Sequence, residues 1–213
     1  MLRLGQTYQV DQLRQEAVHR LSEEFPSTLD AWNTLSQHSW EQIQQPDKDK
    51  DYLALYVECA NLARETGLTR LLPATFMETY HSFPLKEILR GVARPGGTLA
   101  LSAENQQAHI LGIEAMRTAY YQETFRYLDD HTLPSQGCTN LVSCKKFKME
   151  RKAEEWAPSR HLDVLQTWEE SWGDRLCKKC AIVAEEKHNE GRRLVWAKLP
   201  SYFDLPPWEE LNL

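Results

Sequence analysis

The sequence predicts an all-α protein, an irregular multi-helix bundle with a C-terminal helical subdomain rich in Cys and Trp. Apolar residues recur every three or four positions along much of the first part of the chain, which is the period of an amphipathic helix. Stretches with the period of two of a strand are too few to build a sheet. Four of the five cysteines and five of the seven tryptophans follow residue 131. We therefore expect two regions, residues 1–130 and 131–213, that pack as one unit.

The composition is typical of a soluble globular protein. The chain has 213 residues, of which 41% are hydrophobic and 26% charged, and its net charge is −6. An acidic balance disfavours a general nucleic-acid binder, which carries a basic face. No apolar run approaches the ~18 residues of a membrane span, and the N-terminus lacks the apolar core of a signal peptide. We expect a cytoplasmic or nuclear protein with reduced cysteines and no membrane partner.

The first two predicted helices are bounded by residues that favour helix ends. The first begins near Asp11 and ends at Pro26, because proline cannot continue a helix. Its apolar residues are Val10, Leu13, Ala17, Leu21 and Phe25. Residues 27–30 resemble a capping box and therefore predict a short second helix around Trp32.

A strong third helix follows a polar connector at residues 44–50. It extends from about residue 51 to residue 66, and Gly67 ends it. Cys59 lies on the apolar face of this helix, which is typical of a small core residue.

The middle of the chain contains three further predicted helices. Pro73 and Pro84 favour the first turns of two of them. A loop at residues 94–97 and a short extended piece at 98–101 come next. Ser102 then caps a long helix that reaches about residue 128.

The C-terminal tail carries large apolar residues at close intervals. We expect them to pack the tail onto the helices: Trp196, Leu199, Phe203, Leu205 and Trp208. The ring of Trp208 is then buried.

Two pairs of cysteines are the strongest candidates for chemistry. Cys177 and Cys180 form a C-x2-C pair at a turn before a predicted helix, whereas Cys138 and Cys144 form a looser C-x5-C pair. Zinc takes four sulfur ligands in a tetrahedron, and a C-x2-C turn supplies two of them. The spacing predicts one structural zinc ion bound by all four cysteines. The alternative is four reduced thiols packed among aromatic side chains.

His188 offers a competing ligand through the spacing C-x2-C-x7-H. On a helix that starts near Cys180 it lies eight residues further on, about 12 Å along the axis. We therefore expect a packing or surface residue, with replacement of one cysteine as the alternative. A tetrahedron of cysteines leaves no position for water or substrate, and no nucleophile–base pair is evident, so we expect no catalysis.

A basic run after Cys144 permits a second interpretation. Beside a zinc site these side chains could contact phosphate, as in a zinc-dependent nucleic-acid-binding or transcription-related protein. They are Lys145, Lys146, Lys148, Arg151 and Lys152. We favour a solvent-exposed helix face balanced by Glu150, Glu154 and Glu155, because residues 138–213 hold 13 basic and 13 acidic groups.

Several segments resemble one protein family. Residues 2–21, LRLGQTYQVDQLRQEAVHRL, resemble the helical end of a BTB/POZ domain. Residues 24–32, EFPSTLDAW, are similar to BTB-domain proteins that are abundant in mushroom-forming fungi. Residues 71–74, the Cys-Thr…Cys element at 138–144 and the signature at 176–211 resemble the same fungal proteins, the last most closely.

The resemblance implies a non-catalytic protein–protein interaction module, an adaptor or scaffold with BACK-like helices. Some BTB proteins are substrate adaptors of cullin-RING ubiquitin ligases, so other proteins, a cullin-RING ligase or a second copy are the partners that the resemblance implies. The β-containing core of the family would precede Met1. The resemblance therefore does not extend to BTB-mediated dimerisation.

Overall fold

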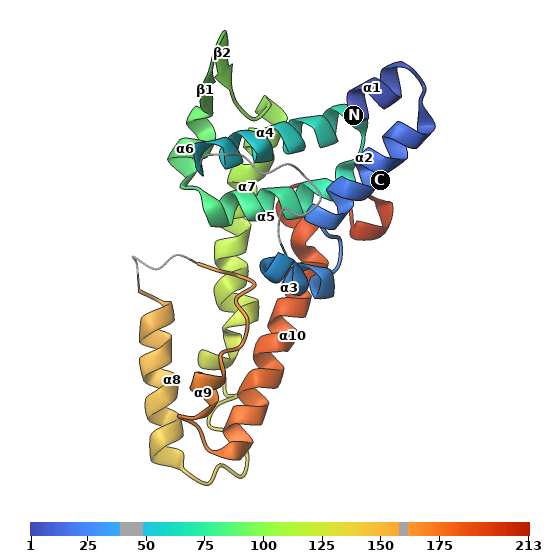
Figure 1. Cartoon of the computed structure of the whole chain (residues 1–213). Coiled ribbons are helices and arrows are strands. Elements are labelled where there is room, and N and C mark those ends of the chain that lie inside the picture. Colours follow the sequence, from blue (N-terminus) through green and yellow to red (C-terminus); the bar gives the residue numbers. More distant parts are fainter. Residues whose placement is uncertain (39–48, 158–161) are drawn as a thin grey trace. The chain divides into compact units, whose positions relative to one another are not determined.

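The computed structural model describes residues 1–38, 49–157 and 162–213. Within these residues the protein has ten α-helices, short 3-10 and π turns, and one two-stranded sheet (Figure 1). The predicted all-α class is thus confirmed. Most of the predicted connector at 44–50 lies outside the described residues. None of the described helices has both the length and the apolar character that crossing a membrane requires.

The chain divides into two compact units. Unit 1 comprises residues 1–113 and 199–213, and unit 2 comprises residues 114–198. The chain passes between them inside α7 (Ala103–Ala119) and inside α10 (Lys178–Tyr202). This division differs from the expected boundary at residue 130. Apolar periodicity does not change where a helix leaves one core and enters another, so the sequence contains no signal for such a boundary.

Unit 1 begins with three helices whose ends follow from local chemistry. They are α1 (Leu2–Thr7), α2 (Asp11–Glu24) and α3 (Leu29–His38). Thr28 caps α3, since its Oγ1 accepts a hydrogen bond from the Ala31 N–H at 3.3 Å. The predicted start at Asp11, the stop before Pro26 and the cap of the second predicted helix are confirmed.

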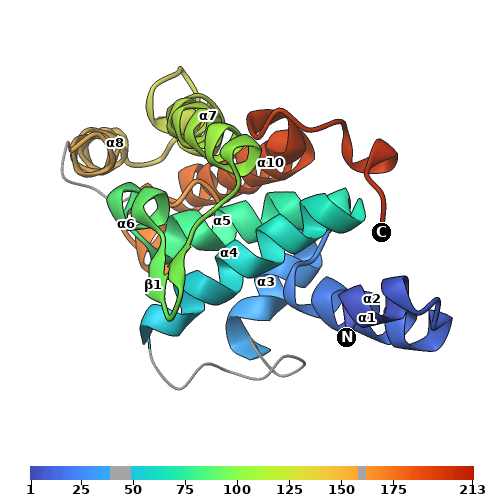
Figure 2. The same ribbon diagram turned by 90° about the horizontal axis from the view of Figure 1, so that it is seen from above.

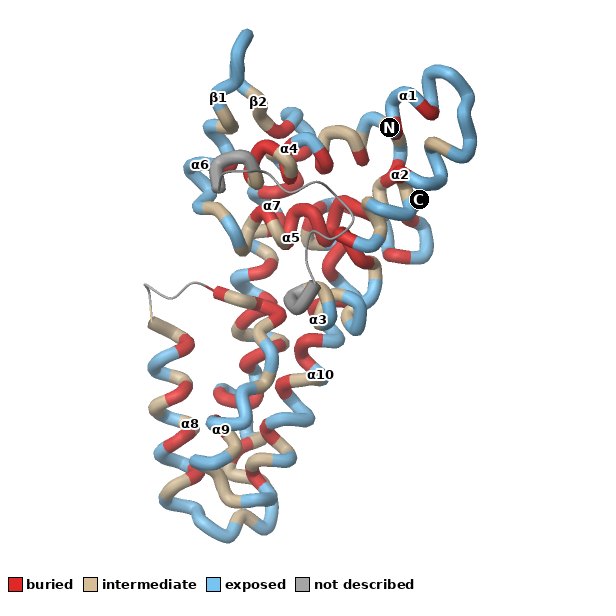
Figure 3. The backbone as a smooth tube through the Cα atoms, in the orientation of Figure 1, coloured by how far each residue is buried: buried red, intermediate tan, exposed pale blue. Residues whose placement is uncertain are grey.

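The core of unit 1 is built on α4 (Asp49–Thr66) and α5 (Leu72–Ser82), which lie side by side (Figures 1 and 2). Gly67 ends α4 with a φ of 73°, a conformation that glycine adopts without strain. Seven of the eleven residues of α5 are buried (Figure 3). A 3-10 turn (Thr69–Leu71) and α6 (Leu85–Arg90) flank α5.

A small hairpin precedes α7. Strand β1 (Val92–Arg94) pairs antiparallel with β2 (Gly97–Leu99), with Val92 opposite Leu99. The short extended piece expected at 98–101 is therefore partly a strand. Ser102 caps α7 as predicted, because its Oγ accepts the Asn105 N–H at 3.2 Å.

The helix expected to reach residue 128 is not continuous. It ends at Ala119 and is followed by a π turn (Tyr120–Thr124) and a 3-10 turn (Arg126–Leu128). A Cβ added to Gly191 would lie 2.3 Å from the Glu123 carbonyl oxygen, so the two backbones pack closely at the π turn. This tertiary contact coincides with the departure from α geometry.

The C-terminal tail closes unit 1. The backbone of Asn212 accepts a hydrogen bond from the Arg70 N–H at 2.9 Å and donates one to Thr69 Oγ1 at 3.2 Å. A final 3-10 turn (Trp208–Glu210) carries Trp208, which is 8% exposed. The predicted burial of the apolar side chains at 196–208 is confirmed for all five.

The remaining helices belong to unit 2. They are α8 (Leu141–Glu155), α9 (Glu170–Gly173) and the first part of α10. Large buried side chains fill the space among them and the turns at 120–128: Phe125, Tyr127, Phe147, Val164, Leu165 and Trp172.

Candidate metal centre

The C-x2-C pair lies at the start of α10. The helix begins at Lys178, so Cys177 directly precedes it and Cys180 lies in its first turn. Cys177 is half-buried and Cys180 is fully buried. The predicted turn that leads into a helix is therefore present.

The C-x5-C pair spans a loop and the first turn of α8. Asn140 caps that helix, since its Oδ1 accepts the Ser143 N–H at 3.1 Å. Cys138 lies in the preceding loop, and Cys144 points inward and is fully buried. The five intervening residues are thus one loop residue, the helix cap and the first three residues of α8.

All four cysteines meet at one place in unit 2. Their Sγ atoms lie within 4.8 Å of one another, and the Cys138 and Cys177 Sγ atoms are 3.8 Å apart. Sulfurs at ~2.3 Å from a tetrahedral metal are about 3.8 Å from each other. The donor set and its spacing therefore fit a metal ion held by four sulfurs.

Backbone and side-chain donors orient the sulfurs. The Cys177 N–H donates to Cys144 Sγ at 3.3 Å, which links the two pairs. The Ser135 N–H donates to Cys180 Sγ at 3.3 Å, and Ser135 Oγ lies at the same distance from that sulfur. Such donors stabilise thiolate charge on metal ligands. Ser135 was not among the predicted site residues, since a backbone N–H aimed at a distant sulfur has no sequence signal.

The cysteines differ in how readily they lose a proton. Backbone N–H groups, first that of Cys180 and then that of Thr139, lower the pKa of the Cys177 thiol to about 5. Burial raises the pKa of Cys144 to about 12 and also raises that of Cys138. Without a cation, Cys138 and Cys144 keep their protons at neutral pH. A metal ion that binds all four sulfurs must therefore displace protons.

Two lysines lie between the cysteines of the C-x2-C pair. A divalent cation with four thiolates leaves two excess negative charges. Lys178 and Lys179, which separate Cys177 from Cys180, are exposed and make no ion pair with any described residue. Their charges are therefore available to offset an anionic metal cluster.

His188 is not part of this cluster. It is fully buried in unit 2, and its Nε2 lies 2.7 Å from the Gln166 carbonyl oxygen. Four rings surround its imidazole with centroids 5.1 to 5.9 Å away: Phe125, Tyr127, Trp168 and Trp172. The expectation that His188 is a packing residue is confirmed.

The expected solvent-exposed face is wrong for three of the five basic residues on α8, because these three bind other parts of the fold. Lys148 donates to the Asp130 and Leu133 carbonyls, and Lys152 pairs with Asp129. Arg151 pairs with buried Glu155 and lies 3.9 Å from the centre of the Trp172 ring.

These contacts leave Lys145 and Lys146 as the two members of the run that face solvent. The expected balance by Glu150 and Glu154 is also present. Lys146 lies 3.8 Å from Glu150, and Arg151 lies 3.2 Å from Glu154.

Cys59 stands apart from the metal centre. It belongs to unit 1, is 8% exposed, and burial raises the pKa of its thiol to about 12. It is the small core residue that the sequence predicts.

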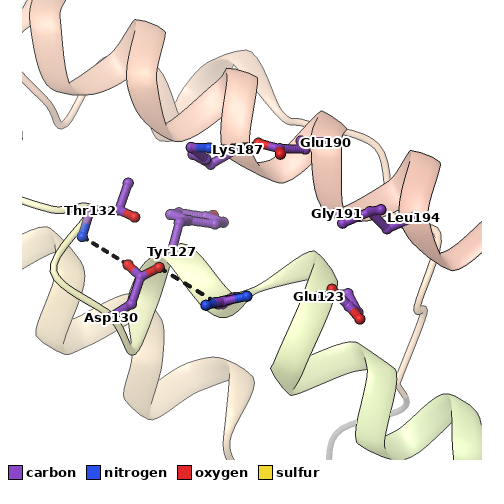
Figure 4. A pocket seen from close by; sticks show the side chains of 9 residues that line it. Glu123, Tyr127, Asp130, Thr132, Lys187, Glu190, Gly191 and Leu194 are labelled. Carbon is purple, nitrogen blue, oxygen red and sulfur yellow. Dashed lines mark hydrogen bonds and ion pairs between the residues drawn. The ribbon is translucent and has the colours of Figure 1, made fainter.

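Unit 2 also has a hollow of about 280 Å³ between the turns at 123–132 and α10 (Figure 4). Its charged side chains all form ion pairs, two of them within the lining and one with Lys198 outside it. Arg126 lies 3.8 Å from Asp130, Lys187 lies 2.7 Å from Glu190, and Glu123 lies 2.6 Å from Lys198. Because each of these charges has a partner of opposite sign, the hollow does not select a charged ligand.

Comparison with known proteins identifies no relative. No protein-family model, no curated protein and no solved structure matches the chain. The site itself therefore carries the functional argument.

Proposed function

We propose that the chain is a non-catalytic protein-interaction module, with a C-terminal unit stabilised by one structural zinc ion bound to Cys138, Cys144, Cys177 and Cys180. The observation that carries the metal assignment is the meeting of four sulfurs from two distant segments within 4.8 Å. Four sulfurs complete a tetrahedral shell, and a complete shell is the mark of a structural rather than a catalytic zinc site.

Zinc is favoured by the ligand chemistry. Tetrahedral sulfur sites suit zinc, and four thiolates also suit iron. The two differ in colour and in elemental analysis. Elemental mass spectrometry of the purified chain, after dialysis without a strong chelator, distinguishes them directly.

The test uses one ligand variant and one matched control. Cys177→Ser removes a ligand, and Cys59→Ser removes the cysteine outside the cluster. We expect one zinc per chain in the wild type and in Cys59→Ser, and loss of zinc from Cys177→Ser. If the wild type contains no metal and all its thiols react in the folded state, the proposal is contradicted. The four cysteines would then be packed thiols and not metal ligands.

The interaction role rests on the resemblance to fungal BTB proteins and on the absence of an open metal position in a four-sulfur site. Adaptors of cullin-RING ligases work by binding other proteins, not by catalysis. Purified cullin N-terminal domain is a direct probe, with size-exclusion chromatography of the mixture as the measurement. Co-elution supports the adaptor role, and separate elution of both folded proteins contradicts it.

A further inference from the structure

The outer face of α8 carries large apolar side chains in solvent. Val142 and Met149 are 81% and 72% exposed. Residues seven apart lie two turns apart on the same side of a helix. The opposite face of α8 carries Cys144 and Phe147, both fully buried. The helix thus presents apolar residues on both faces, and only the inner ones have a place in the core.

Two lysines lie between these apolar residues. Lys145 and Lys146 follow Val142 by three and four positions, so they share its face. Lys145 makes no ion pair with any residue that the structure describes. Lys146 is 73% exposed and lies 3.8 Å from Glu150, an arrangement that contributes little at a surface. We call Val142, Lys145, Lys146 and Met149 the α8 stripe.

We propose that the α8 stripe docks an acidic amphipathic helix of a partner protein. This inference rests on the proposed interaction function and names the chemistry of the partner. Apolar residues one heptad apart would cover Val142 and Met149, and carboxylates between them would meet the two lysines. Helices bind helices through such spaced apolar anchors, and complementary charge selects the partner.

The stripe suits a protein better than a nucleic acid. Nucleic-acid binders neutralise several phosphates, often about 6–10, and stack bases on aromatic rings. The stripe offers two lysines and no aromatic ring, and it places two apolar side chains in the contact area. Contact with a phosphate backbone would leave these apolar groups uncovered.

The metal centre sets the position of the stripe. Cys144, on the inner side of the same helical turns, accepts the Cys177 N–H at 3.3 Å and lies in the four-sulfur cluster. A metal ion that binds the cluster therefore holds the first turn of α8 to the start of α10. Docking on the stripe is then expected to weaken when the metal is removed.

The test uses a synthetic helical peptide with leucines seven residues apart and glutamates between them. Its binding to the full, metal-loaded chain is measured by fluorescence anisotropy at low salt. We expect Lys145→Glu/Lys146→Glu and Val142→Ser/Met149→Ser each to weaken binding by about tenfold. The control Lys86→Glu/Arg90→Glu makes the same change in charge on exposed residues of α6 in unit 1, which belong neither to the cluster nor to the stripe, and we expect it to bind like the wild type.

A charge exchange adds a stricter test. A peptide with lysines in place of the glutamates should prefer Lys145→Glu/Lys146→Glu over the wild type. Equal binding by all variants, or no binding of the acidic peptide, overturns the proposal. Stronger binding of a duplex oligonucleotide, lost in Lys145→Glu/Lys146→Glu, also overturns it in favour of a nucleic acid.

These outcomes are separate from the test of the proposed function. Metal content and circular dichroism are measured on every variant, and the stripe variants should retain both. One outcome is that the acidic peptide fails to bind while zinc stays bound and the cullin probe co-elutes. In that case the interaction role holds and the docking site lies elsewhere. If the wild type contains no zinc, the proposal of a structural zinc ion is contradicted, regardless of the result with the peptide.

Discussion

At the scale of single residues, three buried side chains hold an irregular segment of unit 2 in place. The carbonyls of residues 164–166 are each within 2.6 to 2.8 Å of a side-chain donor. The donors are Thr124, Arg192 and His188. A segment without regular structure needs such partners, because a buried carbonyl without a hydrogen bond is costly. His188 thus contributes to the fold by its ring and by its Nε2.

Two buried histidines make stability depend on pH. Burial lowers the pKa of His188 and that of His109 to about 4. The unfolded chain takes up these protons near pH 6.5, whereas the folded chain resists them until about pH 4. Stability therefore falls as pH decreases from 6.5 to 4, by about 1 kcal/mol per pH unit for each histidine. Urea unfolding across this range measures the slope.

Histidine variants show which unit contributes to the slope of unfolding free energy against pH. His109 packs beside Phe76 and Phe203 in unit 1, and His188 lies near Arg151, Arg192 and Asp163 in unit 2. His109→Gln and His188→Gln should each reduce the slope. A slope that is unchanged in both would show that other groups govern the pH dependence.

Two helical glycines of unit 2 provide a matched pair. A Cβ at Gly191 would lie 2.3 Å from a backbone oxygen, whereas one at Gly173 would meet its nearest neighbour at 3.8 Å. Gly191→Ala should destabilise the protein by about 1–3 kcal/mol through overpacking. Gly173→Ala should be neutral or slightly stabilising. Similar melting temperatures for the two variants would contradict the close packing at Gly191.

At the scale of elements, the tail depends on one large anchor. Trp208 is 8% exposed in unit 1 and lies close in sequence to the backbone bonds of Asn212. Trp208→Ala should cost about 3–5 kcal/mol of unfolding free energy, because it removes a buried ring and leaves a cavity. Tyr8→Ala is the control, since Tyr8 is 72% exposed. A loss below ~1 kcal/mol for Trp208→Ala would show that the ring contributes little to the core.

Helix ends were the most predictable feature among the elements. Asp11, Pro26, Gly67 and Ser102 mark the limits that the structure has, because each acts on the backbone within one turn of its own position. The break after Ala119 was not predictable in this way. It coincides with a backbone contact to Gly191, which is distant in the sequence.

At the scale of the whole molecule, the cluster of cysteines lies entirely within unit 2. Removal of the metal by a chelator should therefore expose amides of unit 2 to hydrogen exchange, because a structural metal contributes directly to folding free energy. The buried amides of α5 in unit 1 should keep their protection. Hydrogen-exchange mass spectrometry with and without chelator measures both.

Two results would contradict this expectation. Equal loss of protection in both units would mean that they unfold together. Unchanged protection in unit 2, with metal shown to be removed, would mean that the thiols pack without needing a cation. Cys59→Ser serves as the reference chain, since it keeps the four ligands.

The spacing of the cysteines predicts only part of the candidate metal site. The pair Cys177 and Cys180 was predictable because both ligands come from one turn. The partnership with Cys138 and Cys144 was an inference from cysteine count, and the positions of the sulfurs depend on α8 lying against the start of α10. The sequence favoured a solvent-exposed face for the basic run, and it missed the contacts of Lys148 and Lys152 because these lie in a loop about 20 residues earlier.

By itself the sequence determined the helical class, most helix limits, the burial of the tail and the identity of the clustered cysteines. These properties follow from apolar period, caps and turn residues, which act over a few positions. The tertiary structure decided the division into two units, the break in α7, the rings around His188 and the exposed outer face of α8. Each of these depends on which distant segments pack together, because burial, hydrogen bonding and charge pairing arise from neighbours in space.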